Sequence, residues 1–272
     1  MTIPFTKAHG AKNDFLLTWT GDAPPASLSE AAVAICDRHT GPGADGWLLV
    51  SPEAPEGCHG SIRLINADGS EAEISGNGTR CAAAFLVAAG RANEEVRIAT
   101  GAGVKHLRLL NRRGDSFEFF MNMGRPVVNP DEVRYGLNTS QGLCDVTILN
   151  VGNPQCAVFV DQLAFDWRSL GQEIERHPKF PRRTNVSFIQ PVDTHTIRVL
   201  FWERGAGETM SSGTGSTGAA AAAVLRGVAA SPVTVLTPAG PLTVTWESED
   251  ISMTGPAEIV ARGEFYWSGE RG

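Results

Sequence analysis

Two stretches rich in serine and glycine run straight into alanine blocks, and their side chains could take part in proton transfer. They read "SGNGTRCAAAF" from Ser75 and "SGTGSTGAAAA" from Ser212, and they align without a gap at an offset of 137 residues (212 − 75). Each serine would lie at or just before the start of a helix, where backbone N–H groups bared by the glycines bind an anion such as a carboxylate. A proton donor or acceptor at such a site suits chemistry at a carbon next to a carboxylate.

Two other interpretations of these stretches stay open from the sequence. Serine is a favoured residue at a helix start, so either serine could be purely structural. The second stretch also contains G-x-G-x-x-G at residues 213–218, and a second match lies at residues 41–46. Dinucleotide binding is the least favoured alternative, because the first match has no acidic residue about 20 positions on and the second leads into a strand.

The surrounding pattern predicts the same elements in each half of the chain. The runs "SIRLI" at 61–65 and "TIRVLFW" at 196–202 are rich in β-branched and aromatic residues and predict strands. After each serine, apolar residues recur at helical spacing; they are Ala82, Phe85, Leu86 and Ala89 in one half and Ala220, Ala223 and Val224 in the other. Two equivalent helix starts facing each other across a cleft would suit inversion at a carbon, with a base on one face and an acid on the other. Repeats also build binding modules, so the symmetry alone does not establish catalysis.

The composition favours a globular protein that acts on a small molecule. The chain has 272 residues, 42% hydrophobic content and a net charge of −7, which argues against a nucleic-acid or anionic membrane surface. No apolar segment of membrane-spanning length is present, and we expect a cytoplasmic protein. Five cysteines without C-x-x-C spacing and six scattered histidines predict neither disulfides nor a metal site.

Six ordered motifs make the chain resemble the diaminopimelate epimerase family over essentially its whole length. They are "HGAKNDF", "DRHTGPGADG", "NADGSEAE-SGNGTRCAA", "VGNPQC", "RTNVSF" and "ERGAGET--SGTG". The resemblance implies an α/β (α+β) fold of two pseudo-symmetric domains, each a mixed sheet wrapped around a central helix, with the active site in the cleft between them. It also implies a homodimer and an amino-acid substrate, with no cofactor. The linker-like "MNMGRPVVNP" predicts that the first half ends near residue 123, and a last strand begins at "MTGPAEIV". The resemblance implies that this strand returns to the first domain, which gives one domain at 1–123 plus 256–272 and the other at 124–255.

The family's site residues transfer to matching positions of this chain. The substrate shell would comprise Asn13, Asn66, Asn153, Asn185, Glu203 and Arg204. The backbones of Gly76 and Asn77, and of Gly213 and Thr214, would bind a carboxylate or stabilise developing negative charge. The asparagines could instead be turn residues, which tolerate positive φ, and Glu203 and Arg204 could be an ordinary surface pair. Two further glutamates, Glu71 and Glu208, are interpreted as structural.

The chain departs from the family at the positions that matter most for catalysis. Serine replaces both catalytic cysteines, at Ser75 and Ser212, and Gln155 replaces the histidine of the family's "GNPHC". A cysteine has a pKa near 8.5 that a helix start can lower, whereas an alcohol needs a neighbouring base. Ser212 could use Glu203 for this purpose. Ser75 would have only Gln155, which cannot accept a proton.

These observations predict a PLP-independent isomerase acting at the α-carbon of an amino acid, either on LL- to meso-diaminopimelate in lysine biosynthesis or on a related amino acid. Its activity would be altered by the serines. The candidate catalytic residues are Ser75, Ser212 and Glu203, and Gln155 joins the substrate shell. Two alternatives remain, a non-catalytic amino-acid-binding homologue and a one-base lyase or isomerase that uses Glu203.

Overall fold

The computed structural model describes residues 1–72, 75–247 and 249–269. The chain divides into two compact units, which we name the first unit (Met1–Met121 with Gly255–Gly272) and the second unit (Asn122–Thr254). The boundaries predicted from the sequence are 1–123 with 256–272 and 124–255.

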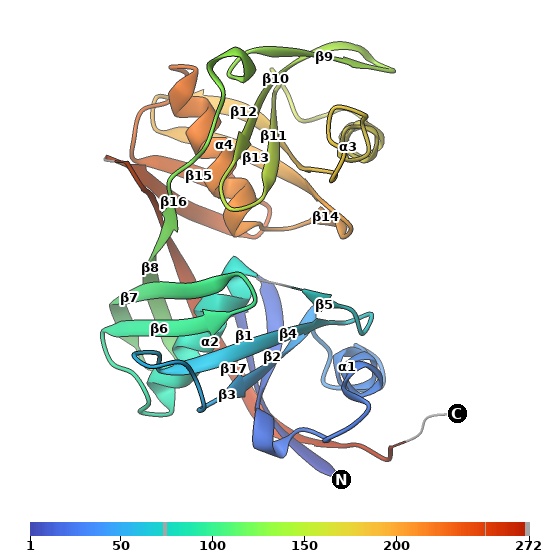
Figure 1. Ribbon diagram of the computed structural model, residues 1–272, viewed down its shortest axis with the longest axis vertical. Helices are drawn as coiled ribbons and strands as arrows, with labels where there is room; N and C mark the ends of the chain where they lie inside the picture. Colours follow the sequence, from blue (N-terminus) through green and yellow to red (C-terminus); the bar gives the residue numbers. More distant parts are fainter. Residues whose placement is uncertain (73–74, 248, 270–272) are drawn as a thin grey trace. The chain divides into compact units, whose positions relative to one another are not determined.

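The first unit is a ring of strands around one helix. Its strands are β1 (Thr2–Gly10), β2 (Asn13–Trp19), β3 (Gly46–Ser51), β4 (Gly60–Asn66), β6 (Glu95–Thr100), β7 (Gly103–Arg113), β8 (Ser116–Gly124) and β17 (Ile251–Tyr266). The ring closes because β17 pairs with both β8 and β1. Helix α2 (Gly76–Ala88) lies within it and contacts β1, β2, β3, β4, β6 and β7 (Figure 1). This helix is buried from Asn77 to Val87, as expected of a helix enclosed on all sides.

The second unit repeats this arrangement around helix α4 (Gly213–Leu225). Its strands are β9 (Tyr135–Thr139), β10 (Gly142–Asn150), β11 (Pro154–Phe159), β12 (Asn185–Asp193), β13 (Thr196–Glu203), β15 (Val233–Thr237), β16 (Gly240–Trp246) and the beginning of β17. Parallel pairs occur at the same places in both units: β2–β3 and β4–β6 correspond to β11–β12 and β13–β15. The expected fold, a mixed sheet around a central helix in each of two similar units, is confirmed.

Smaller elements complete each unit. Short strands β5 (Glu71–Ala72) and β14 (Gly207–Thr209) pair with the ends of β4 and β13. Helices α1 (Leu28–Cys36) and α3 (Trp167–Glu175) pack on the opposite face of the sheet from α2 and α4, and each covers its own hydrophobic cluster. Two 3₁₀ helices, η1 (Thr20–Asp22) and η2 (Pro130–Glu132), lie in connections.

Two strands carry the chain from one unit to the other. The segment "MNMGRPVVNP" was expected to be a linker, but β8 continues through its first residues to Gly124. The last strand was expected to begin with "MTGPAEIV" at Met253, whereas β17 begins two residues earlier, at Ile251 inside the second unit, and continues for 16 residues. Alternation of buried and exposed residues continues across Gly255 and Pro256, and this period of two is what a half-buried strand requires.

Candidate functional site

The two serines cap α2 and α4 in the same way. Ser75 Oγ accepts a hydrogen bond from the Gly78 backbone N–H, and Ser212 Oγ accepts one from Gly215, both at 3.1 Å. Both serines have extended backbones, with φ and ψ of −128° and 125° for Ser75 and −135° and 123° for Ser212. Their expected position at the helix starts is therefore confirmed. Each cap uses the hydroxyl oxygen as an acceptor and leaves the hydroxyl proton for another partner.

In the second unit that partner is a carboxylate. Ser212 donates its hydroxyl proton to Glu203 Oε2 at 2.8 Å, and Thr209 donates to Glu203 Oε1 at 2.6 Å. The β13–β14 hairpin places these groups together, because Glu203 ends β13 and Thr209 ends β14. Burial raises the pKa of the Glu203 carboxyl above its ordinary value, although the two hydroxyl hydrogen bonds act in the opposite direction. Glu203 can therefore exchange a proton closer to neutral pH than an exposed glutamate.

The equivalent position in the first unit carries an amide. At the 137-residue offset, Asn66 corresponds to Glu203, and each is the last residue of its strand, β4 or β13. Asn66 Nδ2 donates to Ser70 Oγ at 3.0 Å. Among the described residues, which do not include 73 and 74, no carboxylate is hydrogen-bonded to Ser75.

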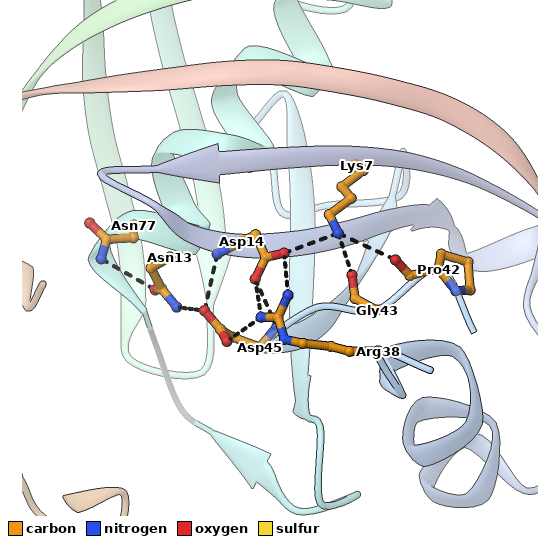
Figure 2. Close-up of polar contacts among 8 residues, drawn as sticks. All are labelled: Lys7, Asn13, Asp14, Arg38, Pro42, Gly43, Asp45 and Asn77. Carbon is orange, nitrogen blue, oxygen red and sulfur yellow. Dashed lines mark hydrogen bonds and ion pairs between the residues drawn. The ribbon is translucent and has the colours of Figure 1, made fainter. Parts of the chain in front are cut away.

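Asn13 and Asn77 meet beside the Ser75 helix start (Figure 2). Asn77 Nδ2 donates to Asn13 Oδ1 at 3.2 Å, and Asn13 Nδ2 donates to Asp45 Oδ2 at 2.7 Å. Asn13 begins β2 directly after a two-residue turn in which Ala11 and Lys12 have positive φ, and Asn77 lies in the first turn of α2. The structure thus brings two of the predicted shell residues into contact within one unit.

The predicted shell residues of the second unit also contact each other. Asn153 Nδ2 donates to Thr214 Oγ1 at 3.2 Å, and Gln155 Nε2 donates to Asn153 Oδ1 at 2.7 Å. Asn185 accepts from the Arg204 backbone N–H at 3.0 Å and donates to the Pro154 carbonyl at the same distance. Gln155 lies in the second unit and contacts Asn153; its expected position beside Ser75 stays a prediction.

The structure tests the alternative, purely structural interpretations of the asparagines and of the charged residues. None of the four predicted asparagines is among the described residues with positive φ, so a left-handed turn does not account for them. Glu203 and Arg204 do not form a surface pair: the Glu203 carboxylate binds two hydroxyls, whereas the exposed Arg204 side chain donates to the Arg182 carbonyl. The two glutamates interpreted as structural form ion pairs with arginines, Glu71 with Arg63 and Glu208 with Arg168.

The side chains of Thr209, Asp45 and Arg80 contact the candidate site and were not predicted from the sequence. Each lies inside a quoted motif, in "GET", "GADG" and "GNGTR" respectively, so a signal was present. Their partners depend on tertiary contacts that residue spacing does not reveal.

Within residues 1–72, 75–247 and 249–269, no group of three or more His, Cys, Asp or Glu side chains has the arrangement of a metal site. In the same ranges, no helix combines the length and apolar character needed to cross a membrane.

Sequence comparison finds relatives that match almost the full length of the chain. The family model for diaminopimelate epimerase matches residues 5–128 and 147–260. A diaminopimelate epimerase from Pelotomaculum thermopropionicum is 41% identical over 276 aligned positions, covering 96% of this chain and 98% of that protein. Diaminopimelate epimerase 1 from a Nostoc species is 39% identical, covering 97% and 100% respectively.

Solved structures share the fold at much lower identity. A phenazine biosynthesis protein of the PhzF family from Bacillus anthracis has a TM-score of 0.72 at 14% identity, covering 98% of this chain and 100% of that one. A probable proline racemase from Agrobacterium radiobacter has a TM-score of 0.71 at 18% identity, covering 98% and 93%. At these identities the likeness concerns the fold.

Proposed function

Because the chain belongs to the diaminopimelate epimerase family and is an isomerase of the epimerase or racemase type, we propose that it moves a proton at the α-carbon of LL- or meso-diaminopimelate, or of a related amino acid, without PLP. The observation that carries this proposal is the 2.8 Å hydrogen bond from Ser212 to the carboxylate of the half-buried Glu203. It supplies a base at a helix start, beside backbone N–H groups that suit a substrate carboxylate.

In the proposed reaction, the α C–H bond breaks and its electron pair passes into the adjacent carboxylate group. Glu203 receives the proton, either directly or through Ser212, whose hydroxyl proton would pass to Glu203 Oε2 as Oγ takes the α-proton. The raised pKa of Glu203 favours this role, since a carboxyl poised nearer neutral pH is the stronger base. The backbones of Gly213 and Thr214, in the first turn of α4, are the candidate groups to stabilise the resulting negative charge.

Inversion needs a proton donor on the opposite face of the carbanion, and Ser75 is our candidate. Its Oγ accepts from Gly78 N–H and keeps its own proton to donate. The alkoxide left behind would lie at the N-terminus of α2, where the helix dipole stabilises negative charge. Because no described residue gives Ser75 a hydrogen-bonded base that could restore its proton rapidly, we expect proton exchange to outpace net inversion.

The proposal is tested by α-proton exchange in deuterated water. The protein is incubated with LL-diaminopimelate, meso-diaminopimelate and a panel of other amino acids, and NMR follows both deuterium uptake and stereochemistry. We expect exchange of at least one diaminopimelate isomer, faster than its inversion, and slower by about 10²- to 10⁴-fold in Glu203→Gln. Glu208→Gln, which alters an exposed glutamate of the same unit, is the matched control.

Two other outcomes separate the remaining interpretations. Exchange with no inversion over long incubation would assign the one-base reaction centred on Glu203. Tight amino-acid binding by calorimetry, with no exchange for any panel member, would refute proton transfer and leave a binding protein.

A further inference from the structure

A continuous chain of hydrogen bonds runs through the Ser75 helix start, which we name the amide chain: Arg80, Asn77, Asn13 and Asp45. Arg80 Nη2 donates to Asn77 Oδ1 at 2.5 Å, Asn77 Nδ2 donates to Asn13 Oδ1 at 3.2 Å, and Asn13 Nδ2 donates to Asp45 Oδ2 at 2.7 Å. Every bond therefore points in the same direction, from the guanidinium toward the carboxylate.

The two ends of the amide chain have fixed hydrogen-bonding character. A guanidinium can only donate, and an ionised carboxylate can only accept. Asn77 must therefore turn its oxygen toward Arg80, and Asn13 must turn its nitrogen toward Asp45. A flip of either amide would place a donor against a donor or an acceptor against an acceptor, so both orientations are determined by the ends.

Both ends are held in place by further contacts. Arg80 is fully buried, and its Nε donates to the Pro256 carbonyl at 3.1 Å. Burial lowers the pKa of Arg80 to about 10, which leaves it charged at neutral pH. At the other end, Arg38 donates to Asp45 at 2.7 Å and to both oxygens of Asp14, and Asp14 also pairs with Lys7 (Figure 2).

The packing leaves little room for another arrangement around Arg80 and Asn77. A Cβ at Gly10, the last residue of β1, would lie 3.1 Å from the Asn77 carbonyl oxygen and 3.3 Å from Arg80 Nη2. Asn77 itself is only 2% exposed. Asn13 is half-buried, so of the two amides its remaining N–H and lone pair are the ones available to a ligand.

We propose that Arg80 and Asp45 are positioning residues, which fix the amides of Asn77 and Asn13 from opposite ends so that Asn13 presents one defined hydrogen-bonding pattern to the substrate. The substrate part of this inference rests on the proposed function. The fixed amide orientation does not, because it follows from contacts within the first unit.

Asp45→Asn tests the acceptor end, because an amide of the same size can present either a donor or an acceptor to Asn13. Side-chain amide resonances are followed in the ¹⁵N-labelled protein, with Asp115→Asn as control; Asp115 forms an exposed ion pair with Arg262 in the same unit, outside the amide chain. We expect the Asn13 side-chain NH₂ signals to move and to exchange faster with water in Asp45→Asn only. Unchanged Asn13 signals would overturn the proposal.

Kinetics then test whether the fixed orientation serves the substrate. In Asp45→Asn we expect KM to rise about tenfold, the effect of one misdirected hydrogen bond, with little change in kcat. In an Asn13→Ala background the same substitution should have no further effect, since the group it positions is gone. An equal KM effect in both backgrounds would show a general structural role and overturn the positioning role.

The buried end is tested by Arg80→Lys against Arg80→Met. Lysine keeps a donor-only group and should retain more of the wild-type Asn77 and Asn13 signals than methionine, and identical signals in the two variants would contradict the inference. If no substrate exchanges in the wild type, the proposed function fails, while the amide signals still decide whether the chain is fixed from its ends.

Discussion

The first turns of α2 and α4 share a backbone conformation and a capping bond, and they differ in the groups beside the capping hydroxyl. In the second unit, Glu203 lies 2.8 Å from Ser212, whereas the first unit has Asn66 at the equivalent position. Among the described residues, the second helix start therefore has a titratable base hydrogen-bonded to its capping hydroxyl and the first does not. The backbone geometry is the same in both copies, and our proposal places the base for proton transfer in the second.

The amides beside the two helix starts differ in a complementary way. Asn13 corresponds to Asn153, since each lies two residues before the first partner in the equivalent parallel pair, and Asn77 corresponds to Thr214 at the 137-residue offset. In the first unit the helix residue donates to the asparagine, and in the second the asparagine donates to the helix residue. Arg80 and Asp45 fix the first arrangement, whereas Gln155 and Thr214 can both donate and accept. The amide orientation of Asn13 is thus fixed in the first unit, whereas the hydrogen-bond partners of Asn153 in the second unit allow either orientation.

The largest effect that would test this comparison is loss of the base. Glu203→Gln should reduce α-proton exchange by about 10²- to 10⁴-fold, the usual contribution of a general base, with little change in thermal stability because the amide still accepts from Ser212. The measurement is deuterium uptake under saturating substrate. Exchange within a factor of two of the wild type would show that the base lies elsewhere.

Thiols should restore activity unequally at the two helix starts. Ser75→Cys should raise the inversion rate about tenfold or more, because a thiol at a helix start acts without a neighbouring base. Ser212→Cys should give a smaller gain, since Ser212 already has Glu203 beside it. Inversion of the proposed substrate is compared in the two single variants, and a larger gain at position 212 would contradict the asymmetry described above.

Substitution to alanine should destabilise the protein more at Gly215 than at the equivalent Gly78. A Cβ at Gly215 would lie 2.8 Å from the buried Phe201 ring and 3.0 Å from Ser212 Cβ, whereas at Gly78 the nearest atoms are 3.3 Å away. We expect Gly215→Ala to lower stability by about 1–3 kcal/mol. Gly78→Ala should stay within about 1 kcal/mol of the wild type, because helix propensity offsets the mild crowding. Paired thermal melts measure this, and equal shifts would be inconsistent with the packing.

The smallest effect expected is on the pH dependence of stability, to which Asp14 and Glu203 should contribute in opposite directions. Burial alone would raise the pKa of Asp14, but Arg38 and Lys7 outweigh it, so the pKa lies below its ordinary value. Asp14 therefore stabilises the fold above its unfolded pKa, and this contribution is lost as pH falls through its folded pKa. Glu203 has a raised pKa, so its contribution is present below its unfolded pKa and lost as pH rises through its folded pKa.

At neutral pH, Asp14→Asn should thus lower the Tm by about 2–4 °C, and the difference should shrink toward pH 3. Glu203→Gln should raise the Tm slightly at neutral pH, with a difference that also shrinks in acid. Melts of both variants between pH 3 and 8 provide the measurement, with Asp115→Asn as the exposed control. Parallel curves for wild type and Asp14→Asn would refute the assignment.

Much of the fold could be predicted because its local signals agree. The strands at 61–65 and 196–202 and the helices after Ser75 and Ser212 follow from hydrophobic period, capping serines and the repeat. Strand β17 begins two residues before the predicted Met253, and its alternation of buried and exposed residues runs through Gly255 and Pro256. A strand can accommodate a proline where no backbone N–H is needed for pairing, because proline has none.

The sequence was enough to predict which residues form the candidate site, but not most of the contacts between them. The hydrogen bond between Ser212 and Glu203 could be anticipated because a short hairpin separates the two residues. Two other contacts could not be anticipated, the one between Asn13 and Asp45 and the one between Arg80 and Asn77. The second lies within "GNGTR", whose first positions were assigned to substrate binding. These contacts depend on how β2 and β3 lie in parallel and on which face of α2 turns toward β1, and both are set by tertiary packing.

Strand β17 has a consequence for the order in which the protein can fold during synthesis. The first unit's ring needs β17 to pair with β1, and the register joins Thr2 to Tyr266. The ribosome makes all of the second unit before most of that strand emerges, so residues 122–254 can complete their own core first. Until then β1 and β8 keep unpaired edges, which are templates for aggregation. Nascent first units would thus be the stage of synthesis at which chaperone binding matters most.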